Sequence, residues 1–331
     1  MTGENGAVAV RAVPELPARS PAETTLSVVL CAYTLERWDD IRAAVASLRS
    51  QTRPADQIVL VSDHNPELLA RATAEFPDVL CLANEETQGL SGARNTGVRA
   101  ATSDVVAFLD DDAAAGPDWV ARMLDAYADP QVVGVGGHVV PAWRAPRPAW
   151  FPDEFLWVVG CSYRGLPTDR AEIRNPIGAN MSFRRRVFDR VGGFDEAMGR
   201  LGKDAAGCEE TEFAIRARAA DPTARIVLEP TAECLHTVSP DRVTRRYFRR
   251  RCRAEGRSKA LVSTLTGAEA ALETERTYVR RTLPRGVLRG LRGLVTGDVA
   301  GATRAWAIVE GTALTASSYA LARLRRRLRR P

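Results

Sequence analysis

Short apolar runs alternate with amphipathic segments over residues 26–112, and this alternation constrains the fold more than any other feature of the chain. The runs at 26–33, 57–63 and 105–110 have the length of strands and consist mostly of apolar residues. Such strands are typical of parallel sheets, because helices cover both faces of a parallel sheet. The pattern predicts an α/β fold with a Rossmann-like, mostly parallel sheet flanked by helices.

Aspartates stand where two of these strands end. Asp63 closes the second strand, and Asp110, Asp111 and Asp112 follow a later one. Ligands of open parallel sheets bind outside the carboxyl ends of the strands. Three adjacent carboxylates supply the hard oxygen ligands that Mg²⁺ or Mn²⁺ prefer. The alternative is a polar turn before a helix with Pro117 in its first turn, but a turn accounts for one aspartate better than for three.

Charge divides the 331 residues into two regions. The formal net charge is +5, but residues 241–331 hold 22 Arg and Lys against 7 Asp and Glu, so residues 1–240 carry −10. The basic region contains arginine runs interleaved with apolar side chains, a pattern typical of helices that bind anionic membranes or nucleic acid. We expect a basic helical extension that lies on an anionic membrane surface or packs on the body, and we do not expect nucleic acid as its partner.

Residues 1–25 lack the basic segment and long apolar run of a signal peptide, so we expect a disordered leader. The six cysteines have no metal-ligand spacing, which is typical of reduced thiols in a cytosolic protein. No run of about 20 uncharged apolar residues is present, so no segment is expected to span a membrane. The folded domain is expected at 26–240, in a cytoplasmic protein that can attach peripherally to the inner face of the cell membrane.

The order of motifs along residues 26–236 resembles that of family-2 glycosyltransferases with the GT-A fold. In such enzymes a metal ion on the aspartates neutralises the diphosphate of a nucleotide-sugar donor. The resemblance implies an inverting glycosyltransferase of the hexosyltransferase type that uses Mg²⁺ or Mn²⁺. It favours a UDP-sugar as donor and a glycan or lipid-linked acceptor, in surface glycan, glycolipid or secondary-metabolite biosynthesis. The motifs, in chain order, are Asp63, GLSGARNTG, FLDDD, GAN, GGFDE and EETEF.

The resemblance also assigns individual residues to the donor site. It implies that Ala32 and Tyr33 form a wall for the nucleoside, that Asp63 contacts the base, and that Asn180 donates to sugar hydroxyls. It places the metal on Asp110, Asp112 and His236, although a lone histidine such as His236 can equally be a packed side chain. The full set implied for the nucleotide sugar is Ala32, Tyr33, Asp63, Gly89, Arg94, Asn95, Asp110, Asp111, Gly178, Ala179 and Asn180.

A glycosyl transfer needs a base that removes the proton of the acceptor hydroxyl. The segment CEETEF resembles the family's GEDxEL segment, in which the Asp is the base. The matching residue here is Glu210, which is longer by one methylene, and Glu209 is the alternate. Without the resemblance, Glu209, Glu210 and Glu212 could simply populate the first turn of a helix, where the helix dipole favours carboxylates.

Three other functions remain as alternatives. A phosphohydrolase with an aspartate nucleophile would carry its aspartates on the first strand, and this chain does not. A sugar nucleotidyltransferase would carry a glycine-rich basic loop after the first strand, where this chain has CAYTLERWDD. A non-catalytic scaffold or regulator with the same fold would have no need of the intact DDD and EE segments. The Q-x-x-R-W motif of processive relatives is absent, which favours transfer of single residues over polymerisation.

Overall fold

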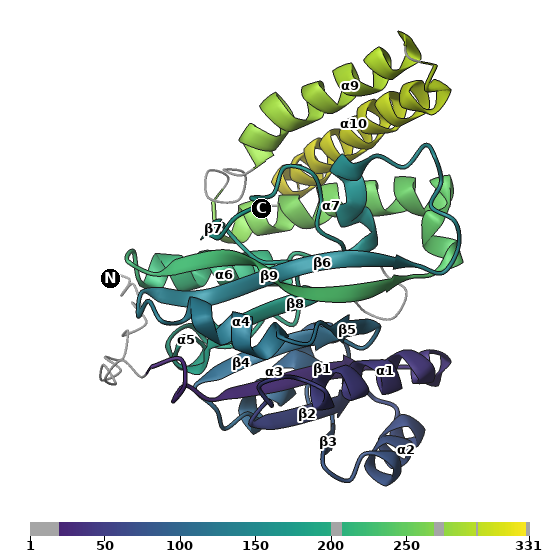
Figure 1. The fold of residues 1–331 in the computed structure, drawn as a ribbon. Coiled ribbons are helices and arrows are strands. Elements are labelled where there is room, and N and C mark those ends of the chain that lie inside the picture. The colour runs from purple at the N-terminus through teal and green to yellow at the C-terminus, as the bar shows by residue number, and fades with distance from the viewer. Residues whose placement is uncertain (1–19, 200–206, 268–274, 296, 329–331) are drawn as a thin grey trace, which may run out of the picture.

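The computed structural model describes residues 20–199, 207–267, 275–295 and 297–328. Within these residues nine strands form one sheet in the spatial order β3-β2-β1-β4-β8-β6-β9-β5, with β7 paired to β9 (Figure 1). The strands are β1 (Leu26–Ala32), β2 (Gln57–Ser62), β3 (Leu80–Ala83), β4 (Val105–Asp110), β5 (Ala113–Ala115), β6 (Val132–Trp143), β7 (Ala171–Glu172), β8 (Asn180–Arg184) and β9 (Arg225–Val238).

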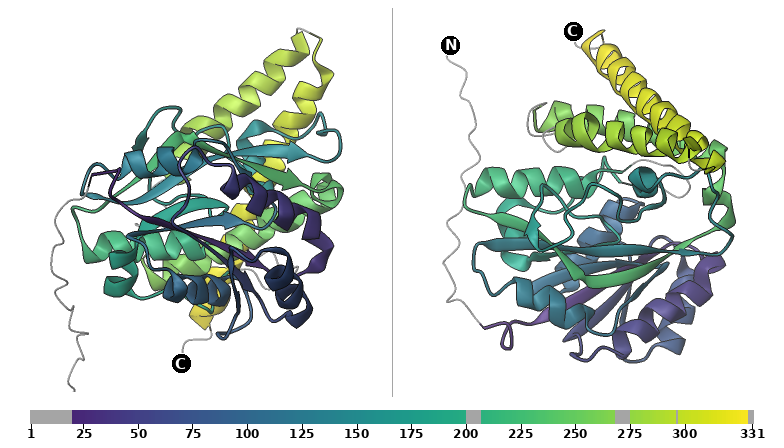
Figure 2. Two further views of the ribbon diagram at one scale, coloured as in Figure 1. Left: turned by 60° about the horizontal axis from the view of Figure 1, so that its bottom comes forward. Right: turned by 45° about the horizontal axis from the view of Figure 1, so that its top comes forward.

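Helices cover both faces of the sheet, and the helices after residue 244 lie beyond β6 and β9, at the end away from β1 to β3 (Figures 1 and 2). The α-helices are α1 (Trp38–Arg49), α2 (Pro66–Glu75), α3 (Leu90–Ala100), α4 (Trp119–Ala126), α5 (Arg185–Val191), α6 (Glu209–Ala220), α7 (Arg245–Leu265), α9 (Leu283–Val295) and α10 (Val299–Leu328). Shorter helical segments are η1 (Leu35–Arg37), η2 (Asp153–Val159), η3 (Pro240–Val243) and the π-helix η4 (Tyr278–Thr282).

The sheet is mixed in direction. Strands β3, β2, β1 and β4 are parallel neighbours, as are β6 and β9, whereas β8, β5 and β7 make antiparallel pairings. The parallel half confirms the prediction for residues 26–110. Apolar content could not reveal the direction of β8, because this strand is buried on both faces like a parallel one.

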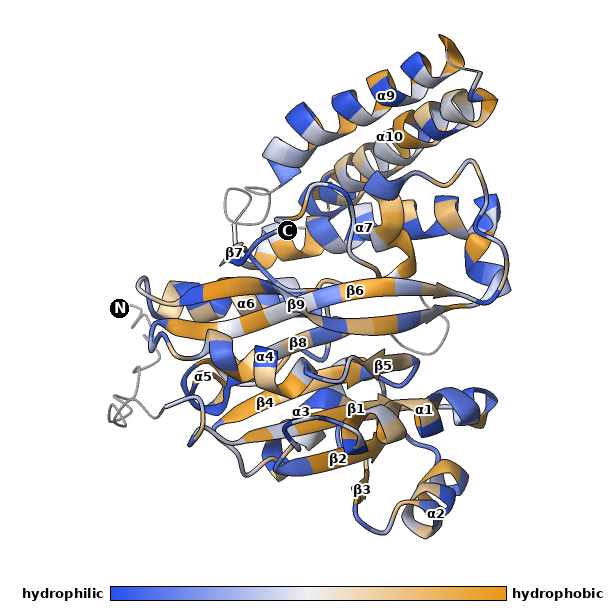
Figure 3. Ribbon diagram, in the orientation of Figure 1, coloured by the Kyte–Doolittle hydropathy of each residue, from blue (hydrophilic) through white to orange (hydrophobic). Residues whose placement is uncertain are grey.

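Two hydrophobic cores sandwich the sheet. Val28 and Leu30 of β1 point into the core that α1 and α4 cover, whereas Val29 between them points into the core under α5 and α6. Successive side chains of a strand alternate between faces, so one uninterrupted apolar strand can supply both cores. Figure 3 shows these strands as predominantly hydrophobic.

The predicted leader is partly ordered. Residues 1–19 lie outside the described residues, but 20–25 form a turn that is tied to the body. Thr25 donates from its hydroxyl to Asp104 over 2.9 Å, and the Arg53 guanidinium donates to the carbonyl of Thr24 over 2.7 Å. Residues 20–25 thus carry side-chain bonds to distant residues, which could not be read from local composition.

The C-terminal helices pack on the body. Helix α10 crosses α7, where the Thr315 hydroxyl donates to the Cys252 carbonyl over 3.2 Å. Glu310 of α10 forms ion pairs with Arg245 and Arg249 of α7. Next to Glu310, Gly311 lies so close to the ring of Phe155 that a side chain at position 311 would collide with the ring. Among the described residues, no helix combines the length and apolar character needed to cross a bilayer.

Candidate active site

A cluster of acidic residues and one histidine forms where β4 ends. Strand β5 follows the aspartates directly and pairs antiparallel with β9, which sets Ala113 opposite His236. The backbone N–H of Thr237 donates to the carbonyl of Asp112 over 2.8 Å. The imidazole Nε2 of His236 thereby lies 3.1 Å from Asp112 Oδ1 and 4.0 Å from Asp110 Oδ2.

This cluster fits a divalent cation. Asp110, Asp112 and His236 each present one ligand atom, and the three atoms lie within 4.8 Å of one another. Two carboxylate oxygens and one imidazole nitrogen form a ligand set that Mn²⁺ and Mg²⁺ accept. In addition, Asp111 Oδ2 is buried without a hydrogen-bond partner in the described part of the chain, which is costly unless a cation or donor faces it.

Two arginines that sequence analysis missed also face the aspartates. Arg37 Nη1 lies 2.9 Å from Asp111 Oδ1 and 3.2 Å from Asp112 Oδ2, and Arg242 Nη2 lies 3.3 Å from Asp112 Oδ2. Arg37 stands in η1 just after the first strand, and Arg242 stands in η3 far along the chain. No motif marks either residue, so only the folded arrangement reveals them.

The positive charges around the cluster give the adjacent Asp111 and Asp112 different pKa values. Burial alone would raise the pKa of Asp112, but His236, Arg242 and Arg37 hold it well below the usual range. Burial and the neighbouring Asp112 charge raise the pKa of Asp111 to about 7. Burial would lower the pKa of His236, yet Asp112 raises it to about 10. The imidazolium of His236 and the guanidinium groups of Arg37 and Arg242 thus supply positive charge to this acidic cluster.

A small cavity of about 70 Å³ opens beside the cluster, at the ends of β1 and β2. The structure brings together here five of the residues expected around the nucleotide. The carboxylate of Asp63 accepts from Asn84 Nδ2 at 2.7 Å and from the Gly89 N–H at 3.0 Å. Gly89 has φ 133°, a conformation that favours glycine. The cavity is lined by Cys31, Ala32, Tyr33, Arg37, Asp63, Leu90, Ala93, Asp110 and Asp111.

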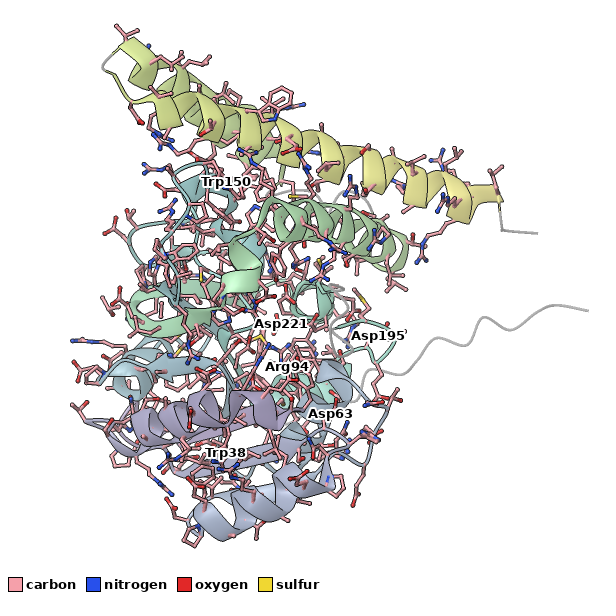
Figure 4. The ribbon with its side chains drawn as sticks, turned by 90° about the vertical axis from the view of Figure 1, so that its right-hand side faces the viewer. Trp38, Asp63, Arg94, Trp150, Asp195 and Asp221 are labelled. Atoms are coloured by element: carbon pink, nitrogen blue, oxygen red, sulfur yellow. The ribbon has the colours of Figure 1, made fainter. Side chains whose placement is uncertain are left out.

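Arg94 connects the donor side of the site to the glutamates of α6. The segment around it is helical from Leu90 onward. The Arg94 guanidinium donates to Glu209 Oε1 at 2.7 Å and to the Gly178 carbonyl at 3.0 Å. It also lies 3.5 Å from Asp110 Oδ1. Figure 4 shows Arg94 in the interior of the protein, above Asp63.

Two residues of the predicted nucleotide-sugar set make hydrogen bonds inside the protein. Asn180 is fully buried, its Nδ2 donates to the Ala232 carbonyl at 2.9 Å, and its Oδ1 accepts from the Trp119 indole at 2.8 Å. Asn95 likewise exchanges two hydrogen bonds with the backbone of Phe194. Asn180 Nδ2 also donates to the His138 carbonyl over 3.1 Å, so both of its amide hydrogens are used inside the protein; its assignment to sugar hydroxyls stays a prediction. Residue type alone cannot distinguish an amide that binds sugar from one that joins strands.

The main cavity, of about 930 Å³, lies between the sheet and the C-terminal helices. Asp110, His236 and Glu210 all line it, so the acidic cluster and the first turn of α6 face the same space. Burial and the neighbouring Glu209 raise the pKa of Glu210 to about 7. Glu209 is held by Arg94, whereas Glu210 accepts a hydrogen bond from the adjacent Thr211 hydroxyl at 3.2 Å and pairs with no arginine or lysine of the described residues.

The C-terminal region supplies much of the cavity wall. Aromatic side chains from three segments line it: Phe155, Trp157 and Tyr163 from residues 155–163, Tyr278 from η4 and Tyr319 from α10. A charged network closes one side, where Arg174 pairs with Glu275 over 2.6 Å and Lys259 pairs with both Glu275 and Glu255. The boundary that we expected at residue 240 therefore does not separate the site from the basic extension.

Solved structures share this fold. A mannosyltransferase from Pyrobaculum calidifontis in complex with GDP-Man and Mn²⁺ matches with a TM-score of 0.55 over 89% of this chain and 88% of that one, at 19% identity. GalNAc-T7 with UDP, GalNAc and Mn²⁺ matches with a TM-score of 0.51 over 78% of this chain and 56% of that one, at 14% identity. The fold is therefore that of the GT-A class, with a mixed sheet flanked by helices.

Sequence comparison defines the family. The family model of glycosyl transferase family 2 matches residues 27–192. The chain belongs to glycosyl transferase family 2, which confirms the prediction. It is similar to glucosyl-dolichyl phosphate glucuronosyltransferase of Haloferax volcanii, with 42% identity over 195 residues. The match covers 58% of this chain and 62% of that relative, so less than two thirds of the relative's length is represented.

Proposed function

We propose that this protein is an inverting glycosyltransferase that moves a sugar from a nucleotide-sugar donor to an acceptor hydroxyl with the help of Mn²⁺ or Mg²⁺. The observation that carries the proposal is the single cavity shared by Asp110, His236 and Glu210. One end of this cavity can hold a metal-bound diphosphate, and the other end presents a carboxyl group of perturbed pKa. Such a pairing of groups is typical of an active site rather than of a scaffold.

Each group has a distinct role in this proposal. Asp110, Asp112 and His236 would hold the metal, and a bound divalent cation neutralises charge that develops on a diphosphate leaving group. Ala32, Tyr33 and Asp63 bound the space for the nucleoside. Because its pKa is raised to about 7, the Glu210 carboxyl can accept a proton at neutral pH and act as general base. A single base that activates the acceptor directly gives inversion at the anomeric carbon.

Donor and acceptor are proposed from chemistry and from the relatives. We infer a UDP-sugar as donor. GDP-sugars are tested beside it, because one of the matched structures holds UDP and the other holds GDP-Man. The name of the Haloferax volcanii relative refers to a lipid-linked acceptor, so we propose an acceptor of the same class, with soluble glycans as the second choice. Residues 26–240 would form the catalytic domain and 241–331 an extension that completes it, in a cytoplasmic protein at the inner face of the membrane.

The first experiment is a thermal-shift screen of UDP-, GDP- and dTDP-sugars with and without Mn²⁺. The proposal expects one nucleotide class to stabilise the protein only when the metal is present. The Asp112→Asn variant should lose this stabilisation, whereas Asp125→Asn, which changes an exposed aspartate of α4, should keep it. A donor that stabilises the protein equally without metal would contradict the metal-dependent proposal.

The second experiment identifies the product. With the donor found in the screen, transfer to lipid-linked and soluble acceptors is followed by NMR, and the coupling constant of the anomeric proton reports the configuration. Inversion supports the proposed role of Glu210, and retention would contradict it. Metal-dependent donor binding without transfer or hydrolysis would favour a non-catalytic protein of the same fold.

A further inference from the structure

Helix α9 buries glycines and exposes leucines, which is the reverse of a helix that packs on a protein core. The buried positions of α9 are Leu283, Gly286 and Gly290. Gly290 lies against the backbone of Gly301 in α10, so close that a side chain could not be accommodated. The large apolar residues point elsewhere: Leu288, Leu291 and Val295 are 47%, 48% and 90% exposed.

These exposed side chains share one face of α9. Leu288, Leu291 and Val295 follow the i, i+3, i+7 spacing of a helical face. Arg289 marks a different side, because its guanidinium forms an ion pair with Glu154 on the body. Leu291 is two positions further on, which is roughly opposite Arg289 on a helix of 3.6 residues per turn. The leucine face of α9 is therefore turned away from the rest of the protein.

Helix α10 repeats this arrangement. Val299, Trp306 and Val309 are 73%, 61% and 48% exposed and again lie three and seven positions apart. Gly311 marks the side of α10 that faces the body, since it contacts the rings of Phe155 and Phe248. Val309 precedes Gly311 by two positions and so lies on the opposite side. Both helices thus direct apolar side chains outward, at the end of the molecule farthest from β1 to β3 (Figures 1 and 4).

The charges beside this apolar face are almost all positive. Residues 278–328 contain ten arginines, with Asp298 and Glu310 as the acidic residues, and both of these acids are already engaged in ion pairs. Arg285 and Arg292 of α9 are exposed, as are Arg325, Arg326 and Arg327 near the end of α10. A partner for this surface must offer an apolar layer bordered by negative charge.

We propose that the outward face of α9 and α10, formed by Leu288, Leu291, Val295, Val299, Trp306 and Val309, docks on the surface of a bilayer that contains anionic lipids. Leucine and valine side chains would enter the boundary between headgroups and acyl chains, Trp306 would lie at the headgroup level, and the arginines would contact lipid phosphates. A second copy of the chain fits less well, because pairing two such faces would bring like-charged arginines together. Docking does not depend on the proposed catalytic activity.

Vesicle flotation of the full chain tests this proposal. The protein is mixed with vesicles of phosphatidylcholine alone, or of phosphatidylcholine with phosphatidylglycerol. We expect binding to the anionic vesicles that weakens as salt is raised, since salt screens exposed charges. The variants Leu291→Glu and Trp306→Glu should each weaken binding by about tenfold or more, because each replaces a buried apolar contact with a charge.

Matched controls separate docking from general effects. Leu80→Glu changes a leucine of 42% exposure on β3, far from α9 and α10, and this variant should bind vesicles as the wild type does. The double variant Arg285→Gln/Arg292→Gln should lose affinity and salt dependence, whereas Arg99→Gln/Arg122→Gln on the body should not. Donor-induced thermal shifts should be retained by the α9 and α10 variants, since none of these residues lines the main cavity.

Several results would overturn the proposal. Equal binding to neutral and anionic vesicles, or no binding to either, would remove the role of the arginines. Unchanged binding by Leu291→Glu and Trp306→Glu would show that the apolar face is not in contact with lipid. A dimer seen by light scattering that these two variants dissociate would identify the face as an interface between copies. Tighter binding to nucleic acid than to anionic vesicles would also contradict it.

Discussion

Arg94 and Glu209 form an ion pair inside the protein, with 2.7 Å between Nη1 and Oε1 and with side chains only 2% and 5% exposed. The pair divides two adjacent glutamates into different roles. Glu209 is held by Arg94, while its neighbour Glu210 has a raised pKa, caused by burial and then by the proximity of Glu209. The glutamate that we propose as base, Glu210, is therefore the one that this arginine does not engage.

The two glutamates should respond differently to the same substitution. Glu210→Gln is expected to lower kcat by about 10²–10⁴-fold, because it removes the base, with donor affinity nearly unchanged. Glu209→Gln is expected to lower the free energy of unfolding, by up to about 3–5 kcal/mol, because it removes the carboxylate nearest to the buried Arg94 guanidinium and leaves Asp110 at 3.5 Å. Steady-state kinetics measure kcat, calorimetry measures donor affinity, and urea unfolding measures the free energy of unfolding of each variant. Loss of turnover in a stably folded Glu209→Gln variant, with an active Glu210→Gln, would reverse the assignment.

The titration of Glu210 should appear in both activity and stability. Its pKa rises from the ordinary 4.5 to about 7 in the folded protein. Activity should therefore increase as pH rises through about 7, where the carboxyl becomes the base. The folded state binds this proton more tightly than the unfolded state, so its stabilising contribution is complete below pH 4.5 and is lost as pH rises through about 7.

Unfolding of the wild type and of Glu210→Gln by urea, at pH values between 5 and 8, measures the stability arm of this prediction. The wild type should lose stability relative to Glu210→Gln as pH rises, because glutamine cannot ionise. A constant difference between the two proteins across this range would show that Glu210 does not titrate there.

His236 should contribute to metal affinity. His236→Gln removes the imidazole nitrogen next to Asp110 and Asp112, and we expect Mn²⁺ binding in the presence of nucleotide to weaken by about 10–100-fold, the effect usual for groups around a metal. Isothermal calorimetry measures this directly. His64→Gln is the matched control, since His64 contacts Asp63 but lies outside the cluster. Equal Mn²⁺ affinity in the wild type and the His236→Gln variant would remove His236 from the ligand set.

Gly97 should be required for the packing of α3 on β1. A methyl group there would collide with the side chain of Val29, so Gly97→Ala is expected to destabilise the protein by about 1–3 kcal/mol although alanine is the better helix former. The double variant Gly97→Ala/Val29→Ala should be less destabilised than the sum of the two single variants, because truncation of Val29 makes room. Additive losses in urea unfolding would argue against this contact.

The sequence predicts those site residues that combine a suitable side chain with a place at the end of an apolar strand. Asp63 and Asp110 follow apolar strands, and the fold rule for strand ends brings them together. His236 required the resemblance, because its approach to Asp112 depends on the pairing of β5 with β9, which sets Ala113 opposite His236, 123 residues later in the chain.

Other parts of the site carried no local signal. Arg37 and Arg242 look like ordinary surface arginines in the sequence, and their ion pairs with the aspartates arise only from tertiary packing. The internal hydrogen bonds of Asn180 carried no signal either, because an amide in a Gly-Ala-Asn segment suits a sugar or a backbone partner equally well. The direction of β8 was missed because cores on both faces of the sheet give parallel and antiparallel strands the same apolar composition.

Strand β9 alternates without interruption between inward and outward side chains from Ala232 to Val238, with Cys234 and His236 inward and Leu235 outward. The position of His236 beside Asp110 and Asp112 therefore depends on whether the number of residues between Ala232 and His236 is odd or even. Removing one residue between Ala232 and His236 would put Thr237 where the imidazole now lies and turn His236 to the outer face. During divergence, insertions and deletions in this segment can preserve the ligand set only if they come in pairs or are absorbed by a bulge, so length variation here should be rarer than substitution.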